Sequence, residues 1–175
     1  GIDDAKTAQG LLEFRGVGRR FPRHGEVAIP GGGSFTLVDD FGHHPVETEV
    51  TLAAARAAYP GRRLVLAFQP HRYSRTRDQF DKFAAVLSSV DALVLSEVYP
   101  AGEEPIAGAD SHALARAIRA RGRSEPVVVG KAAELASVLP DVLQDGDLLL
   151  MMGAGDIGAV ATHIAVEGFK GEGEA

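Results

Sequence analysis

The amino-acid sequence predicts an α/β fold: a doubly wound, mostly parallel sheet with helices on both faces and a β-hairpin near the N-terminus. Short apolar runs alternate with longer segments of helical periodicity, which is typical of strands joined by crossover helices. Because the runs are apolar throughout, they should be buried on both faces, with helices on both sides and right-handed connections. The predicted strands are RLVLAF (63 to 68), ALVLSEV (92 to 98), PVVVG (126 to 130) and LLLMM (148 to 152).

The N-terminal part of the chain departs from this alternation. A short helical pattern from Asp3 to Phe14 leads into a basic, glycine-rich segment. The stretch EVAIPGGGSFTLV then predicts the hairpin, because its three consecutive glycines can adopt the positive φ angles of a tight turn.

Helix boundaries follow from capping residues and apolar spacing. Pro45 suits the first turn of a helix, where a backbone N–H would have no partner. Thr76, with Gln79 three residues later, predicts a capping box at the start of the next helix, and Asp110 is the expected N-cap of a third. Residues 132 to 143 and 157 to 166 complete the set. The predicted buried faces are Val46, Val50, Ala53, Ala54 and Ala57, then Phe80, Phe83, Ala84 and Leu87, then Leu114, Ala117 and Ile118.

Composition excludes several classes of protein. Hydrophobic residues at 45% and charged residues at 24% are ordinary for a globular domain, and no apolar run approaches the ~20 residues of a membrane span. The absence of cysteine excludes disulfides, thiolate metal sites and cysteine nucleophiles, and fits a cytoplasmic location. Aromatic residues are only 6% and tryptophan is absent, which disfavours stacking on bases. We expect neither nucleic acid nor membrane as a partner.

Charge is distributed unevenly along the chain. The net charge is −6, but residues 15 to 77 contain ten basic and five acidic side chains, so this segment carries +5 and the remainder −11. An anionic ligand should therefore bind to the first half of the chain.

Two aspartates and two histidines stand together in DDFGHHP (39 to 45), between a predicted strand and a predicted helix. In a parallel sheet this position is the carboxyl edge, where ligands bind. A metal site needs three or four converging ligands, which adjacent loop residues rarely provide. A turn that only caps the helix is a second interpretation, and a loop that binds a small molecule is the one we favour.

The segment FQPHRYSRTR (68 to 77) also runs from a strand end into a helix start. Its arginines, Arg72, Arg75 and Arg77, should converge with the positive end of the helix on one place, which suits a carboxylate or a phosphate. A solvated basic turn is the alternative.

The segment GAGDIG (153 to 158) matches G-x-G-x-x-G. The dinucleotide fingerprint also requires a further strand with an acidic residue about 20 positions on, whereas the chain ends 17 residues after the motif. We therefore prefer tight packing of the last strand against the last helix over a nicotinamide or flavin site.

Motifs that activate a nucleotide or an acyl group are missing from the sequence, namely G-x-x-x-x-G-K-[ST], G-x-S-x-G and H-E-x-x-H. The first residues, GIDDAKTAQG, contain neither an initiator methionine nor the apolar segment of a signal peptide. We expect the binding half of a longer protein whose catalytic half lies upstream. The basic segment RGVGRRF (15 to 21) is then a hinge or a solvated linker.

Four segments resemble, in order and spacing, the motifs of the Mur ligases of peptidoglycan synthesis: GVGRRF, LVDDFGHHPVE, FQPHRYSRTRDQF and GDLLLMMGAGDIG. They extend from residue 16 to residue 158 and most resemble the branch that adds L-alanine to UDP-N-acetylmuramate, with the ligase that recycles murein tripeptide second. The resemblance implies a Rossmann-like C-terminal domain over residues 19 to 175. Residues 1 to 18 would be a hinge and the end of a central domain that binds most of the ATP and Mg²⁺.

The resemblance also implies roles for individual residues. Arg20 and Asp40 would reach the ribose and base of ATP across the hinge. Arg72 and Arg75 would hold the carboxylate of L-alanine, which agrees with the charge distribution. The residues that wall the methyl pocket and orient the amine would be Phe41, His43 and His71. Asp39 and His44 are left as structural partners, and no metal ligand or catalytic residue is expected.

In the family reaction, ATP phosphorylates the lactyl carboxylate of the sugar, and the amine of L-alanine then attacks the acyl phosphate. The domain would contribute orientation and closure rather than acid–base chemistry, and the fragment alone should be inactive. Two hypotheses from other classes stay open. One is a stand-alone nucleotide- or anion-binding module, and the other is a metal-dependent hydrolase centred on DDFGHHP.

Overall fold

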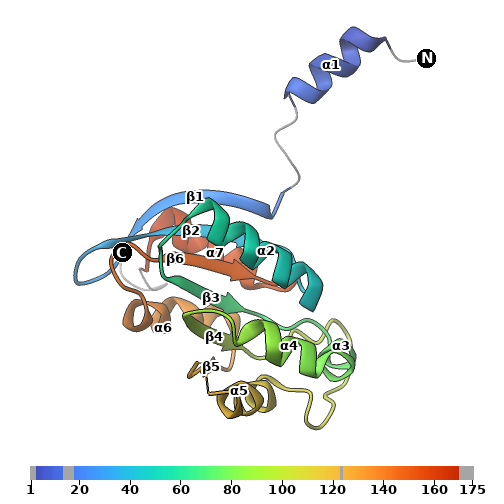
Figure 1. Cartoon of the computed structure of the whole chain (residues 1–175), viewed down its shortest axis with the longest axis vertical. Coiled ribbons are helices and arrows are strands. Elements are labelled where there is room, and N and C mark those ends of the chain that lie inside the picture. The colour runs from blue at the N-terminus through green and yellow to red at the C-terminus, as the bar shows by residue number, and fades with distance from the viewer. Residues whose placement is uncertain (1–2, 14–17, 123, 170–175) are drawn as a thin grey trace.

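A computed structural model of the chain describes residues 3–13, 18–122 and 124–169 (Figure 1). Its centre is a six-stranded sheet in the order β1-β2-β6-β3-β4-β5. Strands β2 to β6 run parallel to their neighbours, and β1 pairs antiparallel with β2. The strand bounds are β1 (Arg20–Ala28), β2 (Ser34–Asp40), β3 (Leu64–Phe68), β4 (Ala92–Ser96), β5 (Val127–Val129) and β6 (Leu148–Met152). The predicted mostly parallel α/β sheet with an N-terminal hairpin is confirmed.

Helices cover both faces of the sheet and enclose two hydrophobic cores. One core lies under α2 (Pro45–Ala58), α4 (Phe80–Leu87) and α5 (Ser111–Ala120), and the other under α6 (Leu135–Val142) and α7 (Ile157–Glu167). Strand β3 serves both, because successive side chains point to opposite faces: Leu66 and Phe68 enter the first core, and Val65 and Ala67 the second. The remaining elements are α1 (Asp4–Glu13), which projects away from the sheet in Figure 1, α3 (Tyr73–Asp78) and the 3-10 turn η1 (Ala132–Glu134).

The hairpin turn depends on its three glycines. Gly31, Gly32 and Gly33 have φ angles of 94°, 127° and 86°, a region that residues with a side chain rarely adopt. The turn is closed by a hydrogen bond from the Ile29 N–H to the Gly33 carbonyl (3.0 Å). Strand β2 then runs between β1 and β6 as far as Asp40, so both aspartates of DDFGHHP are the last residues of a strand.

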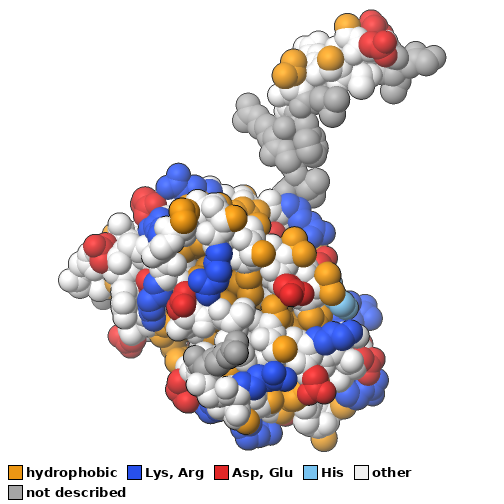
Figure 2. Space-filling model, viewed as in Figure 1, with side chains coloured by type: hydrophobic (Ala, Val, Ile, Leu, Met, Phe, Trp, Pro, Cys, Tyr) orange, Lys and Arg blue, Asp and Glu red, His pale blue; other side chains and the backbone are white. Residues whose placement is uncertain are grey.

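The predicted buried face of α2 is wrong. Val46 and Val50 are 56% and 64% exposed, and hydrophobic side chains lie at the surface over this helix (Figure 2). The helix buries a different set, namely Pro45, Thr48, Leu52 and Ala55. At its first turn, Glu47 accepts hydrogen bonds from the backbone N–H groups of His43 and His44. Apolar spacing could not decide the face, because alanines fit either side of this helix.

The predicted capping box at Thr76 is also wrong, because the chain is already helical from Tyr73 onwards. The Thr76 hydroxyl lies inside α3 and donates to the Arg72 carbonyl (2.9 Å). The first turn of α3 is instead capped from a distant loop, where Glu103 accepts hydrogen bonds from the Ser74 N–H (2.9 Å) and hydroxyl (2.6 Å). A partner 29 residues away in sequence leaves no local signature.

The other helix predictions hold. The Asp110 carboxylate accepts a hydrogen bond from the Ala113 N–H (2.6 Å) at the start of α5. The predicted inward faces of α4 and α5 lie in the first core, with Phe83, Leu87, Leu114 and Ile118 fully buried. No helix within the described part of the chain is long and apolar enough to cross a bilayer.

The corrected face of α2 gives a stability prediction. Leu52 is 4% exposed, so Leu52→Ala should lower the free energy of unfolding by about 2–5 kcal/mol through lost burial and an unfilled cavity. Val50→Ala, two residues earlier on the exposed side, should change it by less than about 0.5 kcal/mol. Urea unfolding of both variants measures the difference. Equal effects would contradict the orientation of the helix.

Candidate functional site

The loops that follow β2, β3, β4 and β6 meet at the carboxyl edge of the sheet. Backbone hydrogen bonds join them beyond the strands, from the Gly153 N–H to the Asp40 carbonyl (3.1 Å) and from the Tyr99 N–H to the Pro70 carbonyl (2.8 Å). This edge gathers DDFGHHP, the arginine segment and GAGDIG. It adds the loop after β4, which carries Tyr99 and Glu103.

The polar side chains of DDFGHHP turn to different partners. Asp39 pairs with Arg19, and the two carboxylate oxygens of Asp40 accept hydrogen bonds from the N–H groups of Phe21 (2.9 Å) and Gly42 (2.7 Å). His44 caps α2, with its Nδ1 accepting from the Val46 N–H (3.4 Å). Among the described residues no three His, Asp or Glu side chains converge as a metal site would require.

Four aromatic rings from three of these loops form a continuous row, which we call the ring row: Phe41, His43, His71 and Tyr99. The Phe41 and His43 rings meet edge to face with centroids 5.3 Å apart. The His43 and His71 rings are also 5.3 Å apart, and His71 stacks on Tyr99 at 5.5 Å and 8°. Three predicted site residues are thus neighbours, although they come from two separate loops.

Two of the three predicted arginines lie beside the ring row. Arg75, one helical turn after His71, donates to the His71 carbonyl (3.1 Å) and to its ring Nδ1 (3.3 Å). Arg72 is half exposed, with a guanidinium nitrogen 3.8 Å from Glu103. Arg77 instead pairs with its neighbour Asp78 (2.7 Å) and is mostly exposed, so the predicted convergence of all three arginines is wrong. Helix α3 begins too early for Arg77 to reach the edge.

The electrostatics of the ring row favour a neutral His71 and an ionised Glu47. Burial lowers the pKa of the His71 imidazole, and His43, Arg75 and Arg72 lower it further. Burial tends to raise the pKa of Glu47, but hydrogen bonds from the backbone of His43 and His44 hold that pKa below its usual range. The positive charge beside the ring row therefore comes from the guanidinium groups of Arg72 and Arg75 rather than from His71.

Arg19 fixes the start of β1 to this edge. Its guanidinium makes two hydrogen bonds to Asp39 (2.9 and 3.1 Å) and one to the Gly153 carbonyl (2.7 Å). It also lies 5.4 Å from the centroid of the Phe41 ring, and its carbonyl accepts from the Phe41 N–H (2.7 Å). Of the basic segment 15 to 21, residues 15 to 17 lie outside the described residues, and residue 19 onwards is anchored rather than a solvated linker.

The glycines of GAGDIG allow close packing. A Cβ atom at Gly155 would lie 2.3 Å from Gln69 Oε1 and 2.7 Å from the Tyr99 ring, and one at Gly158 would lie 2.1 Å from the Arg19 guanidinium carbon. Gln69 also donates to Asp156 (2.6 Å) and accepts from the Ile157 N–H (3.2 Å). The motif thus packs the last helix against the site loops.

Arg20 and Asp40 line one hollow of about 410 Å³, beside Phe41. The hollow is walled by Phe21, Val46, Glu47, Val50 and Thr51. The Arg20 side chain is half exposed, with a nitrogen 3.8 Å from Glu47, whereas Asp40 is almost fully buried. Arg20 is therefore available to a ligand, and Asp40 mainly holds the backbone of the hollow's wall.

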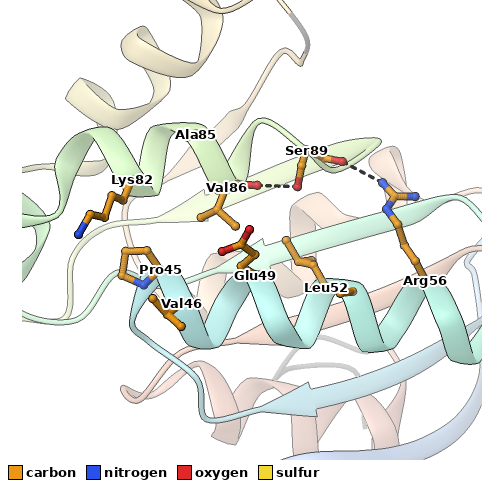
Figure 3. Close-up of a pocket in the computed structure, with 10 residues that line it drawn as sticks. Pro45, Val46, Glu49, Leu52, Arg56, Lys82, Ala85, Val86 and Ser89 are labelled. Atoms are coloured by element: carbon orange, nitrogen blue, oxygen red, sulfur yellow. Dashed lines mark hydrogen bonds between the residues drawn. The ribbon is translucent and has the colours of Figure 1, made fainter.

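A second surface hollow lies between α2 and α4 (Figure 3). It measures about 480 Å³, and Pro45, Leu52 and Val86 are among the apolar residues lining it, together with Glu49, Arg56 and Lys82. Arg56 donates to the Ser89 carbonyl at one end (2.8 Å). None of the predicted site residues lines this groove.

Sequence reasoning missed Arg19, Gln69, Tyr99 and Glu103 as residues of the site. One available signal was position: Tyr99 and Glu103 follow the apolar strand β4, at the same carboxyl edge as the other motifs. Arg19 lies in the basic segment 15 to 21, but spacing alone does not identify its buried partner.

Comparison with known families identifies this arrangement. The family described as "Mur ligase, glutamate ligase domain" matches residues 19–155. The chain belongs to the Mur ligase family. This Mur ligase domain is 79% identical over 175 residues to the UDP-N-acetylmuramate--L-alanine ligase of Stenotrophomonas maltophilia and 70% identical over 172 residues to that of Xanthomonas oryzae pv. oryzae. The two alignments include 100% and 98% of this domain but only 37% and 36% of the relatives. The domain therefore spans just over a third of their length.

Solved structures confirm the Rossmann-like fold of this Mur ligase domain. The UDP-N-acetylmuramate-alanine ligase of Thermotoga maritima aligns over 93% of the domain and 33% of its own chain, with a TM-score of 0.67 and 29% identity. The murein peptide ligase of Psychrobacter arcticus aligns over 100% and 34%, with a TM-score of 0.66 and 20% identity. The second likeness concerns the fold alone.

The Arg19–Asp39 pair gives a prediction for stability. Asp39→Asn should lower the free energy of unfolding by about 3–5 kcal/mol, because the side chain is 2% exposed and the guanidinium loses its buried counter-charge. Asp78→Asn, which breaks the exposed pair with Arg77, should leave the free energy of unfolding nearly unchanged, because water screens exposed ion pairs. Chemical unfolding at neutral pH compares the two. A small change in the free energy of unfolding in Asp39→Asn would show that the Arg19–Asp39 pair does not stabilise the fold.

His71 gives a prediction for pH. Because its pKa in the folded protein lies below the usual value of 6.5, the unfolded chain binds a proton more readily, and the free energy of unfolding should fall as the pH drops below 6.5. His71→Gln should remove that part of the pH dependence, whereas His112→Gln, at an exposed position on α5, should leave it. Unfolding measured at about pH 7.5 and about pH 5.5 decides between them.

Proposed function

We propose that this chain is the amino-acid-binding C-terminal domain of an ATP-dependent ligase that joins L-alanine to UDP-N-acetylmuramate. The observation that carries the proposal is the placement of Arg72 and Arg75 beside the ring row, at the carboxyl edge of the sheet. The 79% identity to a ligase of that name over the whole chain supports the choice of amino acid and sugar.

The site offers complementary groups to a small amino acid. The two guanidinium groups suit its carboxylate, because arginine presents paired N–H donors in a fixed plane. Phe41, His43 and His71 form a wall of rings for a methyl side chain, and the rings hold one another by contact. Holding the amine near the reacting carbon is worth about 7–11 kcal/mol at the upper limit of such effects.

The hollow that contains Arg20 and Asp40 would receive the base and ribose of ATP. Its residues fit that part of a nucleotide, because Phe21, Val46 and Val50 provide apolar contact and the half-exposed Arg20 provides guanidinium donors. When bound, ATP supplies the phosphoryl group that activates the sugar carboxylate. The triphosphate and Mg²⁺ would be held mainly by residues outside this chain. Residues 1 to 18 would form the end of a central domain and a hinge. The ligase would act in the cytoplasm.

The complete protein that contains this chain should consume ATP only with both UDP-N-acetylmuramate and L-alanine present. No ATP consumption is expected when murein tripeptide is supplied instead of L-alanine. A preference for the tripeptide would favour the recycling ligase, and binding without turnover would favour a stand-alone module. The chain alone should show no turnover.

Removal of one guanidinium tests the site assignment. Arg75→Ala should raise the KM for L-alanine by about 10- to 100-fold, because a charge-assisted hydrogen bond contributes about 1.5–3 kcal/mol. Arg77→Ala should leave that KM unchanged, since Arg77 pairs with Asp78 away from the ring row. Steady-state kinetics with varied L-alanine measures both variants. An unchanged KM in Arg75→Ala would remove this residue from the site.

A further inference from the structure

We infer that His43 is the proton acceptor of this site, taking a proton from the ammonium group of the bound amino acid, while His71 is held as a neutral donor. The inference rests on the proposed function and goes beyond it, because the domain was expected to contribute orientation alone. The inference depends on the tautomers of His43 and His71, that is, on which ring nitrogen carries the hydrogen in each imidazole. In a neutral imidazole one nitrogen donates and the other accepts.

The hydrogen-bond partner of His43 fixes its tautomer. Its Nδ1 lies 3.0 Å from the Phe41 carbonyl oxygen, which can only accept a hydrogen bond, so Nδ1 carries the hydrogen. The lone pair is therefore on Nε2. That atom has no hydrogen-bond partner within the described residues and is not one of their buried, unpaired polar atoms, so it is accessible from outside the fold.

The partner of His71 fixes the opposite tautomer. Its Nδ1 lies 3.3 Å from a guanidinium nitrogen of Arg75, and a guanidinium can only donate. Nδ1 must accept, so the hydrogen of His71 is on Nε2. A second proton would have to sit on Nδ1 against the guanidinium, which also explains why Arg75 contributes to the lowered pKa of His71.

The charged groups beside His43 differ from those beside His71. Glu47, on α2, places a carboxylate oxygen 3.8 Å from His43 Nδ1. On one side, His71 is neutral, with Arg75 and then Arg72 behind it. On the other side, Arg19 and Arg20 lie against the Phe41 ring, with their guanidinium carbons 5.4 and 5.7 Å from its centroid. Of the two imidazoles, His43 is the one with a carboxylate beside Nδ1 and no hydrogen-bond partner at Nε2 among the described residues.

The proton transfer meets a requirement of the chemistry. An α-amino group is mostly protonated at neutral pH and then has no lone pair with which to attack. In the step inferred here, one N–H bond of the ammonium breaks, the proton binds to His43 Nε2, and the electron pair of that bond stays on the amine nitrogen. The imidazolium later releases the proton to water. Side chains in this role typically contribute about 10²- to 10⁴-fold to a rate.

Nitrogen-15 NMR of the histidine rings in this chain tests the tautomers without any activity. At neutral pH we expect hydrogen on Nδ1 of His43 and on Nε2 of His71. Arg75→Ala should release His71 into a mixture of tautomers and leave His43 unchanged. Hydrogen on Nε2 of neutral His43 would overturn the inference, whether or not the proposed function holds.

Kinetics of the complete ligase tests the chemical role. His43→Gln should lower kcat/KM for L-alanine by about 10²- to 10⁴-fold at neutral pH. Hydroxylamine, a nucleophile that is largely unprotonated at that pH and needs no base, should still trap the acyl phosphate at a rate close to that of the unaltered enzyme. His44→Asn, which replaces the neighbouring imidazole by another good helix cap, should behave as the unaltered enzyme with both nucleophiles.

The outcomes separate the inference from the proposed function. Loss of both the alanine and the hydroxylamine reactions in His43→Gln would show a structural role and overturn the inference, as would retention of both. An unaltered enzyme that does not use L-alanine at all would overturn the proposed function, and the NMR result would then still decide the tautomers of His43 and His71.

Discussion

Asp39 is the second-last residue of β2 and its carboxylate is almost fully buried, and a buried carboxylate is stable only beside a partner that neutralises it. Arg19 is that partner. The same guanidinium reaches the Gly153 carbonyl and lies against the Phe41 ring, so one side chain joins the start of β1, the end of β2 and the loop after β6. The positions of Phe41, and through it of His43, depend on this contact. The Arg19 guanidinium can lie this close to α7 only because residue 158 is a glycine.

The opposite end of the ring row is held in a similar way from the loop after β4. Glu103 caps α3 through Ser74 and lies near Arg72, while Tyr99 stacks on His71. Acidic side chains therefore stand behind both ends of a site that faces outward with positive charge. Hydrogen bonds to the fold keep Glu47 ionised, so the cationic groups can stay close together before an anionic ligand arrives.

The two histidines of the ring row differ in their hydrogen-bond partners, although their imidazole rings are chemically the same. A carbonyl beside one imidazole and a guanidinium beside the other impose opposite tautomers. Both partners are local, since Phe41 and Arg75 are within four residues of the rings that they orient. The direction of each side chain, however, depends on the loop and helix geometry around it.

The sequence by itself determined the sheet, the hairpin, the edge at which the site lies and the gathering of DDFGHHP with Arg72, Arg75 and His71. These follow from apolar runs, glycine turns and the rule that parallel strands end at one edge, all of which are local in the chain. Only the tertiary structure decided which face of α2 is buried, where α3 begins, that Arg77 turns away, and that Arg19, Tyr99 and Glu103 belong to the site. Arg77 pairs with its own neighbour Asp78, and the face of α2 is decided by packing on the sheet, where Leu52 and Ala55 join the first core. The start of α3 and the places of Arg19, Tyr99 and Glu103 depend on partners on other elements. Sequence spacing does not record them, because packing, capping carboxylates and counter-charges act across space.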